Sequence, residues 1–103
     1  DRGARARVAA RHAVLGGEGP LLLLPGRGTR LKGHMDAIVL LAALRAHGVD
    51  ARLWMPGALQ EGRKAYGAEL RRRALEAGVD HAIAITPATG AIAEAFAASD
   101  LVL

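Results

Sequence analysis

The sequence of 103 residues lacks cysteine and has very few aromatic residues. Without cysteine, no disulfide framework and no thiolate metal site can form, which leaves the compartment open but favours the cytoplasm. Because aromatic residues make up only 3% of the chain, the core must be built from Leu, Val, Ile and Ala, a composition that suits helices packed on a parallel sheet. No apolar run approaches the ~20 residues that span a bilayer, and no signal peptide is visible.

Carboxylates are also scarce relative to basic side chains. The chain has 12 Arg and 2 Lys against 10 Asp and Glu, which gives a formal net charge of +4. This balance favours contact with an anionic partner. Nucleic acid, a phosphorylated small molecule and an acidic membrane surface all fit, and each would require a different distribution of the basic residues.

The length of the chain accommodates one small domain and leaves no room for a second complete one. The chain begins with Asp1, and its last residues, SDLVL, predict the opening of a buried strand. We therefore expect residues 1–103 to form a single partial domain of a longer chain. A fourth strand of only three residues would leave apolar sheet surface uncovered, so we also expect self-association through that edge or disorder at the terminus.

Apolar runs and turn residues alternate in a pattern that predicts helices and strands in turn. We expect helices over 4–15, 35–46, 64–77 and 91–98, and strands near 21–25, 51–55, 81–85 and 101–103. Strands that alternate with helices imply right-handed crossovers and a parallel sheet. The predicted class is α/β, a Rossmann-like parallel sheet in the strand order 3-2-1-4 with flanking helices. The helix over 35–46 is so apolar that we expect it to be covered on more than one side.

Such sheets bind ligands at the carboxyl ends of their strands, beside the point where the strand order reverses. The loop after the first strand is therefore a candidate ligand-binding site. Residues 21–34, which include this loop, have the sequence LLLLPGRGTRLKGH. A P-loop requires G-x-x-x-x-G-K-[ST], whereas here the lysine precedes the glycine. A dinucleotide fingerprint requires a third glycine where this chain has Leu31, and the second strand ends in Met-Pro-Gly without an acidic residue for a ribose hydroxyl. The missing third glycine and the missing acidic residue argue against an NAD site.

A third pattern, G-R-x-x-x-x-K-G, is satisfied by Gly26, Arg27, Lys32 and Gly33. With these residues the sequence resembles the C-terminal, nucleotide-sugar-binding domain of GT-B glycosyltransferases of family 4. The likeness covers nearly the whole chain, in four segments that follow in order: LLLLPGRGTRLKGH, AALRAHGVDARLWMPG, YGAELRRRALEAGV and IAEAFAASDLVL. One departure is Gly28, where these enzymes usually have an aliphatic residue.

The resemblance implies how the basic loop would act. Transfer of a sugar from a nucleoside diphosphate develops negative charge on the departing diphosphate. The resemblance implies no bound metal and no cofactor besides the nucleoside-diphosphate sugar, which is the donor substrate, so fixed cations must neutralise this charge. By the resemblance, Arg27 and Lys32 are the diphosphate ligands, with Gly26 and Gly33 beside them and a helix N-terminus adding partial positive charge.

The function implied by the resemblance is that of a retaining glycosyltransferase. It would transfer a sugar to a glycan or lipid-linked acceptor in polysaccharide or lipopolysaccharide assembly, in the cytoplasm or at the inner face of the membrane. In this family the acceptor site lies in an N-terminal domain, and a pair of glutamates follows the fourth strand. Both lie outside residues 1–103, and Glu94 precedes that strand and does not match the pair. We therefore expect no catalytic residue here and no activity from this stretch alone.

Other polar residues leave alternatives open. Thr86 and Pro87 fit the N-cap and first position of the last helix, whereas the resemblance places the same turn near the nucleotide base. His34 is interpreted as a helix-start residue rather than a base. The remaining three histidines are interpreted as surface residues, since their spacing does not match a metal site.

The alternative function is a non-catalytic nucleotide- or nucleic-acid-binding module. The run Arg71–Arg73 favours it, but Arg72 and Arg73 have Glu partners one helical turn away. The chain also offers few aromatic residues on which bases could stack. A solvated helix face is therefore the preferred interpretation, and we expect no nucleic-acid partner.

Overall fold

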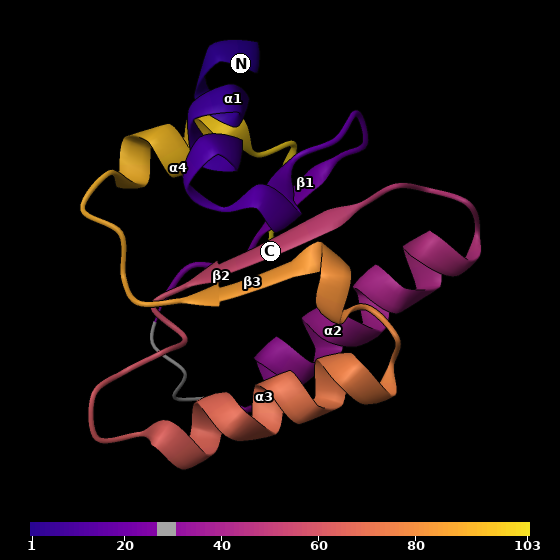
Figure 1. Ribbon diagram of the computed structural model, residues 1–103, viewed down its shortest axis with the longest axis vertical. Coiled ribbons are helices and arrows are strands. Elements are labelled where there is room, and N and C mark those ends of the chain that lie inside the picture. The colour runs from indigo at the N-terminus through magenta and orange to yellow at the C-terminus, as the bar shows by residue number, and fades with distance from the viewer. Residues whose placement is uncertain (27–30) are drawn as a thin grey trace.

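Four strands form one parallel sheet in the spatial order β3-β2-β1-β4, which confirms the predicted class and strand order (Figure 1). The computed structural model describes residues 1–26 and 31–103, and the side chains of residues 31 and 32 also lie outside the description. In chain order the elements are α1 (Arg2–Arg11), the 3-10 helix η1 (Ala13–Leu15), β1 (Leu21–Leu23), α2 (Leu31–Ala46), β2 (Arg52–Pro56), α3 (Lys64–Glu76), the 3-10 helix η2 (Asp80–Ala82), β3 (Ile83–Thr86), α4 (Ile92–Ala98) and β4 (Leu101–Val102).

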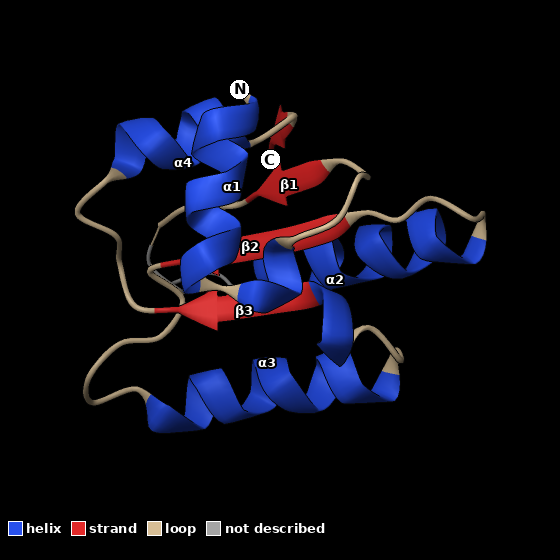
Figure 2. Cartoon of the chain, turned by 45° about the horizontal axis from the view of Figure 1, so that its top comes forward, coloured by secondary structure: helices blue, strands red, loops and turns tan. Residues whose placement is uncertain are grey.

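Helices cover both faces of the sheet. α2 and α3 lie on one face, and α1 and α4 lie on the other (Figures 1 and 2). The sheet is therefore the middle layer of three.

In the described part of the chain, no helix combines the length and the apolar character that a membrane crossing requires.

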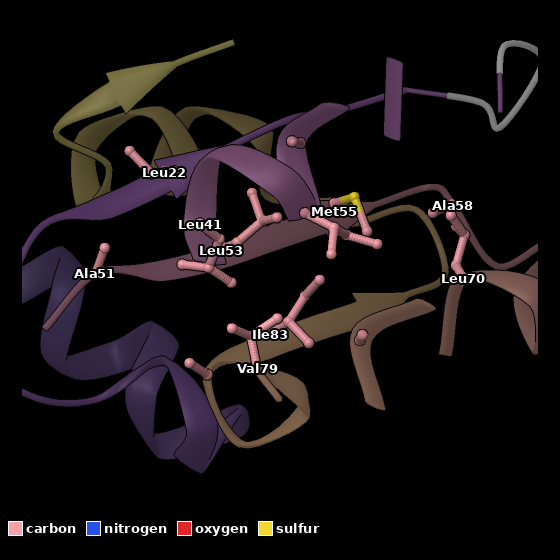
Figure 3. Close-up of a cluster of buried hydrophobic side chains, with 13 residues drawn as sticks. Leu22, Leu41, Ala51, Leu53, Met55, Ala58, Leu70, Val79 and Ile83 are labelled. Atoms are coloured by element: carbon pink, nitrogen blue, oxygen red, sulfur yellow. The ribbon is translucent and has the colours of Figure 1, made fainter. Parts of the chain in front are cut away.

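Strand side chains alternate between two hydrophobic clusters, as the period of two in a strand requires. The cluster beneath α2 and α3 buries Leu22, Leu53, Met55 and Ile83 against Leu41 and Leu70 (Figure 3). The cluster beneath α1 and α4 buries Leu21, Leu23, Trp54 and Ala84 against Val8, Leu15 and Ala95. Full burial of one such aliphatic side chain contributes about 1.5–3 kcal/mol relative to exposure, so these clusters are the main source of stability.

Several predicted elements differ from the structure in their bounds, among them the helix expected over 35–46, which begins at Leu31. The helix expected over 4–15 is broken at His12, which has φ −134° and ψ 89°, and a 3-10 turn follows. The His12 ring is half-buried against Trp54, with the ring centroids 5.3 Å apart, so it is not the surface residue that we expected. The strand expected from residue 81 begins at Ile83, because Asp80–Ala82 form a 3-10 turn.

α2 is less covered than its apolar sequence predicts. Ile38 and Leu41 are buried in the cluster against the sheet, as expected for its inner face. Val39, however, is 67% exposed and Leu40 is 37% exposed. α2 thus packs on the sheet and on α3, as predicted, but the strip that contains Val39 and Leu40 is open.

An ion-pair cluster joins the two helices on the other face. Glu94 of α4 accepts a hydrogen bond from Arg7 Nε at 2.8 Å and also pairs with Arg11, and both arginines belong to α1. The hydrogen bonds from Arg11 and then Arg7 hold the pKa of the Glu94 carboxyl below its ordinary value of 4.5. Glu94 is thus a structural link between α1 and α4.

We expect Glu94→Gln to lower the melting temperature at pH 7. A carboxylate with a lowered folded-state pKa stabilises the fold above its ordinary pKa, and this contribution is lost as the pH falls through the folded-state value. The melting temperatures of variant and wild type should therefore converge as the pH falls well below 4.5. Circular dichroism melts at several pH values measure this, with Glu18→Gln as control, since Glu18 is exposed and has no ion pair among the described residues. A difference that does not change with pH would contradict the assignment.

We also expect the chain to self-associate through β4. Leu101 and Val102 are 50% and 45% exposed, and β4 lies at the edge of the sheet, where it pairs with β1. A lysine on an edge strand blocks pairing with a second copy, so Leu101→Lys should shift the population toward monomer in sedimentation velocity runs over a concentration series. Leu75→Lys on α3 is the control, since Leu75 is 63% exposed but lies away from that edge. A wild-type chain that stays monomeric at high concentration would refute this prediction.

Candidate functional site

The carboxyl ends of β1, β2 and β3 meet at one edge of the sheet and are linked by backbone hydrogen bonds. The N–H of Gly26 donates to the carbonyl of Pro56 at 3.0 Å. The carbonyl of Thr86 accepts from Gly57 at 3.0 Å and from Leu59 at 3.1 Å. The three loops that follow these strands are therefore held side by side.

Two glycines allow this close arrangement. Gly26 and Gly57 have φ of 114° and 91°, a region that side-chain-bearing residues rarely adopt. A Cβ on Gly57 would lie 2.9 Å from the carbonyl oxygen of Gly26, whereas a Cβ on Gly26 would meet no atom of the described residues within 4 Å. Gly57 is thus required by packing as well as by conformation, whereas Gly26 is required by conformation alone within the described part of the chain.

A pocket of about 580 Å³ opens at this edge, and we call it the carboxyl-edge pocket. Its lining comes from all three loops and the start of α4: Pro25, Gly26, Pro56, Gly57, Leu59, Gln60, Glu61, Ala88, Thr89 and Ile92. Its volume lies within the range of small-molecule sites, ~300–1,000 Å³. Leu59 and Ile92 provide apolar surface, while Gln60 and Thr89 provide polar groups.

Of the predicted diphosphate ligands, the structure describes only a part. Arg27 lies outside the described residues, and for Lys32 only the backbone is described, as the second residue of α2. Gly33 is exposed in the same turn, and a Cβ there would meet nothing within 4 Å. None of the residues lining the carboxyl-edge pocket is basic. Any cation for an anionic ligand there must therefore come from its surroundings.

Thr86 and Pro87 have a different role from the predicted helix start. The Thr86 hydroxyl accepts from Trp54 Nε1 at 2.9 Å and donates to the carbonyl of Pro87 at 3.0 Å. α4 begins only at Ile92, with Ala91 at its N-cap position, so the interpretation of Thr86 and Pro87 as N-cap and first helical residue is wrong. The Thr86 hydroxyl instead connects the end of β3 to the buried indole of β2.

A partly buried pair beside this edge was not expected from the sequence. His34 lies in the first turn of α2, as predicted, but its side chain is only 5% exposed. Tyr66 Oη, in the first turn of α3, lies 2.5 Å from His34 Nδ1. The Arg63 guanidinium lies 4.7 Å from the centroid of the Tyr66 ring. Residues 34 and 66 are too far apart in the chain for any local pattern to indicate this contact.

The arginine run on α3 has the predicted intrahelical partners. Arg73 Nε lies 2.9 Å from Glu69 Oε1, and Arg72 lies 2.6 Å from Glu76 Oε1. Arg72 also contacts Glu69. The hydrogen bonds that Glu69 accepts from Arg72 and, to a lesser extent, from Arg73 lower the pKa of its carboxyl group. Arg72 and Arg73 therefore bind carboxylates of their own helix.

A second pocket lies at the opposite, amino edge of the sheet, and Arg5 is the best placed cation in it. Its guanidinium, however, donates to the carbonyl oxygens of Leu15 at 2.9 Å and Gly19 at 2.9 Å. Asp100 and Glu18 add negative charge to the same lining. The lining of this pocket thus contains two arginines and three carboxylates, whereas that of the carboxyl-edge pocket contains, among the described residues, one carboxylate, Glu61, and no cation. In residues 1–26 and 31–103, no group of three or more acidic or histidine side chains could hold a metal ion.

The fold matches the crystal structure of a glycosyltransferase from Rickettsia africae ESF-5 with a TM-score of 0.82 and 18% sequence identity. The match covers 99% of this chain and 26% of that chain, so the present chain spans about a quarter of the length of that protein. At this identity the likeness shows a shared fold. No protein-family model and no curated protein matches the chain.

The geometry of the edge predicts different outcomes at two glycines. Gly57→Ala and Gly62→Ala should each lower the free energy of unfolding by about 1–2 kcal/mol, because both residues have positive φ, 91° and 82°. Gly57→Ala should lower it by about 1–3 kcal/mol more, because the new Cβ would press on Gly26, whereas a Cβ on Gly62 would meet no atom of the described residues within 4 Å. Urea unfolding of both variants measures the difference. Equal losses would show that the contact between the two loops is not tight.

Proposed function

We propose that this chain is the nucleotide-sugar-binding part of a glycosyltransferase. The observation that carries the proposal is the pocket at the carboxyl edge of the sheet, which Pro25 and Gly26 line at the end of β1. This is where Rossmann-like sheets bind their ligands. The match to a solved glycosyltransferase over 99% of the chain supports the same assignment.

The diphosphate of the donor would bind where β1 leads into α2. Arg27 would grip two phosphate oxygens through its planar guanidinium, and Lys32 would add a compact charge in the first turn of the helix. α2 has 16 residues, and the unpaired N–H groups at its N-terminus favour negative charge. Gly26 and Gly33, at which a Cβ would meet no atom of residues 1–26 and 31–103 within 4 Å, would let the phosphates approach the backbone. Together these groups would stabilise the charge on the leaving diphosphate without a metal.

The nucleoside would occupy the carboxyl-edge pocket. Leu59 and Ile92 offer apolar surface to a base, and Gln60 and Thr89 offer polar contacts. Thr86 and Pro87 would lie near the base, but the Thr86 hydroxyl is already bound to Trp54 and to the Pro87 carbonyl. We therefore assign any base contact there to the backbone of that turn.

The remaining parts of the reaction would come from outside residues 1–103. We propose a retaining transfer to a glycan or lipid-linked acceptor, in polysaccharide or lipopolysaccharide assembly, in the cytoplasm or at the inner face of the membrane. An N-terminal domain of the same protein would hold the acceptor. The one glutamate of α4, Glu94, is bound to Arg7 and Arg11, so it does not replace the missing catalytic carboxylates.

Binding of nucleoside diphosphates to variants of this chain tests the proposal. Losing one charge-assisted hydrogen bond costs about 1.5–3 kcal/mol, or about ten- to a hundredfold in affinity. Arg27→Ala and Lys32→Ala should each weaken the binding of UDP or GDP by this factor in isothermal titration calorimetry. Arg72→Ala is the matched control and should leave the affinity unchanged, because Arg72 is bound to Glu69 and Glu76.

An oligonucleotide titration distinguishes the alternative. A surface that follows a nucleic-acid backbone would depend on Arg72 as much as on Lys32 and would lose affinity steeply with salt. That result, or no binding of either nucleoside diphosphate, would overturn the assignment of this site.

A further inference from the structure

The interior of the described chain contains one charged or polar side chain, that of His34. Its imidazole is 5% exposed and lies between the first turns of α2 and α3. A buried polar group costs free energy unless it is hydrogen-bonded, and an aliphatic residue would fill the same space without that cost. A histidine at this position therefore points to a requirement for its hydrogen bond.

The partner of His34 is Tyr66, and their contact is well defined. Tyr66 Oη lies 2.5 Å from Nδ1, and the rings meet edge to face, with centroids 5.6 Å apart and planes at 85°. Arg63, the residue before α3, places its guanidinium 4.7 Å from the Tyr66 ring centroid. Burial raises the pKa of Tyr66 above its ordinary value of 10.0, with Arg63 acting in the opposite direction, so the phenol keeps its proton near neutral pH.

The contact joins the two segments that would hold the two halves of a nucleotide. His34 follows Lys32 by two residues in the turn assigned to the diphosphate. Tyr66 and Arg63 follow the loop that contributes Leu59 and Gln60 to the carboxyl-edge pocket. A hydrogen bond between two side chains has a narrow range of lengths and angles, whereas apolar packing alone tolerates sliding.

We propose that His34 and Tyr66 are positioning residues, which hold the first turn of α2 at a fixed distance from α3 so that the diphosphate ligands are preorganised. This inference rests on the proposed function. Neither side chain contacts the diphosphate in this scheme, and each acts through the backbone of residues 31–34. The free energy of one hydrogen bond limits the effect on affinity, so its loss should weaken diphosphate binding by about three- to tenfold.

The test uses Tyr66→Phe, which keeps the ring and removes the hydroxyl, and His34→Leu, which keeps a similar volume and removes the nitrogen. Both variants should bind UDP or GDP three- to tenfold more weakly than the wild type. Their affinity for inorganic pyrophosphate, used as a probe of the diphosphate site alone, should fall by the same factor. The double variant should lose no more than either single one, because the pair acts as a unit. Amide NMR spectra verify that each variant is folded.

Two controls separate positioning from general destabilisation and from failure of the proposed function. Glu94→Gln destabilises the opposite face of the sheet, so it should lower the melting temperature and leave the affinity unchanged. If it weakens binding as much as Tyr66→Phe does, the positioning role is wrong. If Lys32→Ala abolishes binding but Tyr66→Phe changes it less than twofold, only this inference fails. If the wild-type chain binds neither nucleotide, the proposed function fails first.

Discussion

β1 and β2 are hydrogen-bonded on both sides and buried on both faces, and the arrangement of the whole chain follows from this double burial. Each strand must supply apolar side chains in both directions, so Leu53 and Met55 face one layer of helices while Trp54 faces the other. Parallel strands also require a crossover between each pair, and the helices that cover the sheet make these crossovers. The carboxyl ends of the strands therefore gather at one edge.

That edge has the features of a binding site because backbone groups hold its loops together. The hydrogen bonds from Gly26 to Pro56 and from Gly57 to Thr86 link β1, β2 and β3 in series. Because these bonds are made by the backbone, the side chains of the loops can line the pocket. His34 and Tyr66 join α2, the helix that follows β1, to α3.

The sequence was sufficient for the topology and for contacts within one helix, but not for contacts between distant elements. Alternating strands and helices predicted the order 3-2-1-4, because the crossover rules leave few alternatives. The pairing of Arg73 with Glu69 followed from the helical period. The break at His12, the pairing of Glu94 with α1 and the contact of His34 with Tyr66 all depend on which elements pack together. The exposure of Val39 has the same origin, since its apolar character does not indicate which face of α2 is covered.

We propose that this sheet edge binds a nucleoside diphosphate, and mapping amide chemical shifts of the wild-type chain during a titration with UDP or GDP tests this proposal. We expect shifts confined to residues 24–36, 57–61 and 87–92; of these, 24–26, 57–61 and 87–92 lie at the carboxyl edge and 31–36 begin α2. Shifts centred on Arg5, Gly16–Gly19 and Asp100 would place the ligand at the amino edge and overturn the proposal.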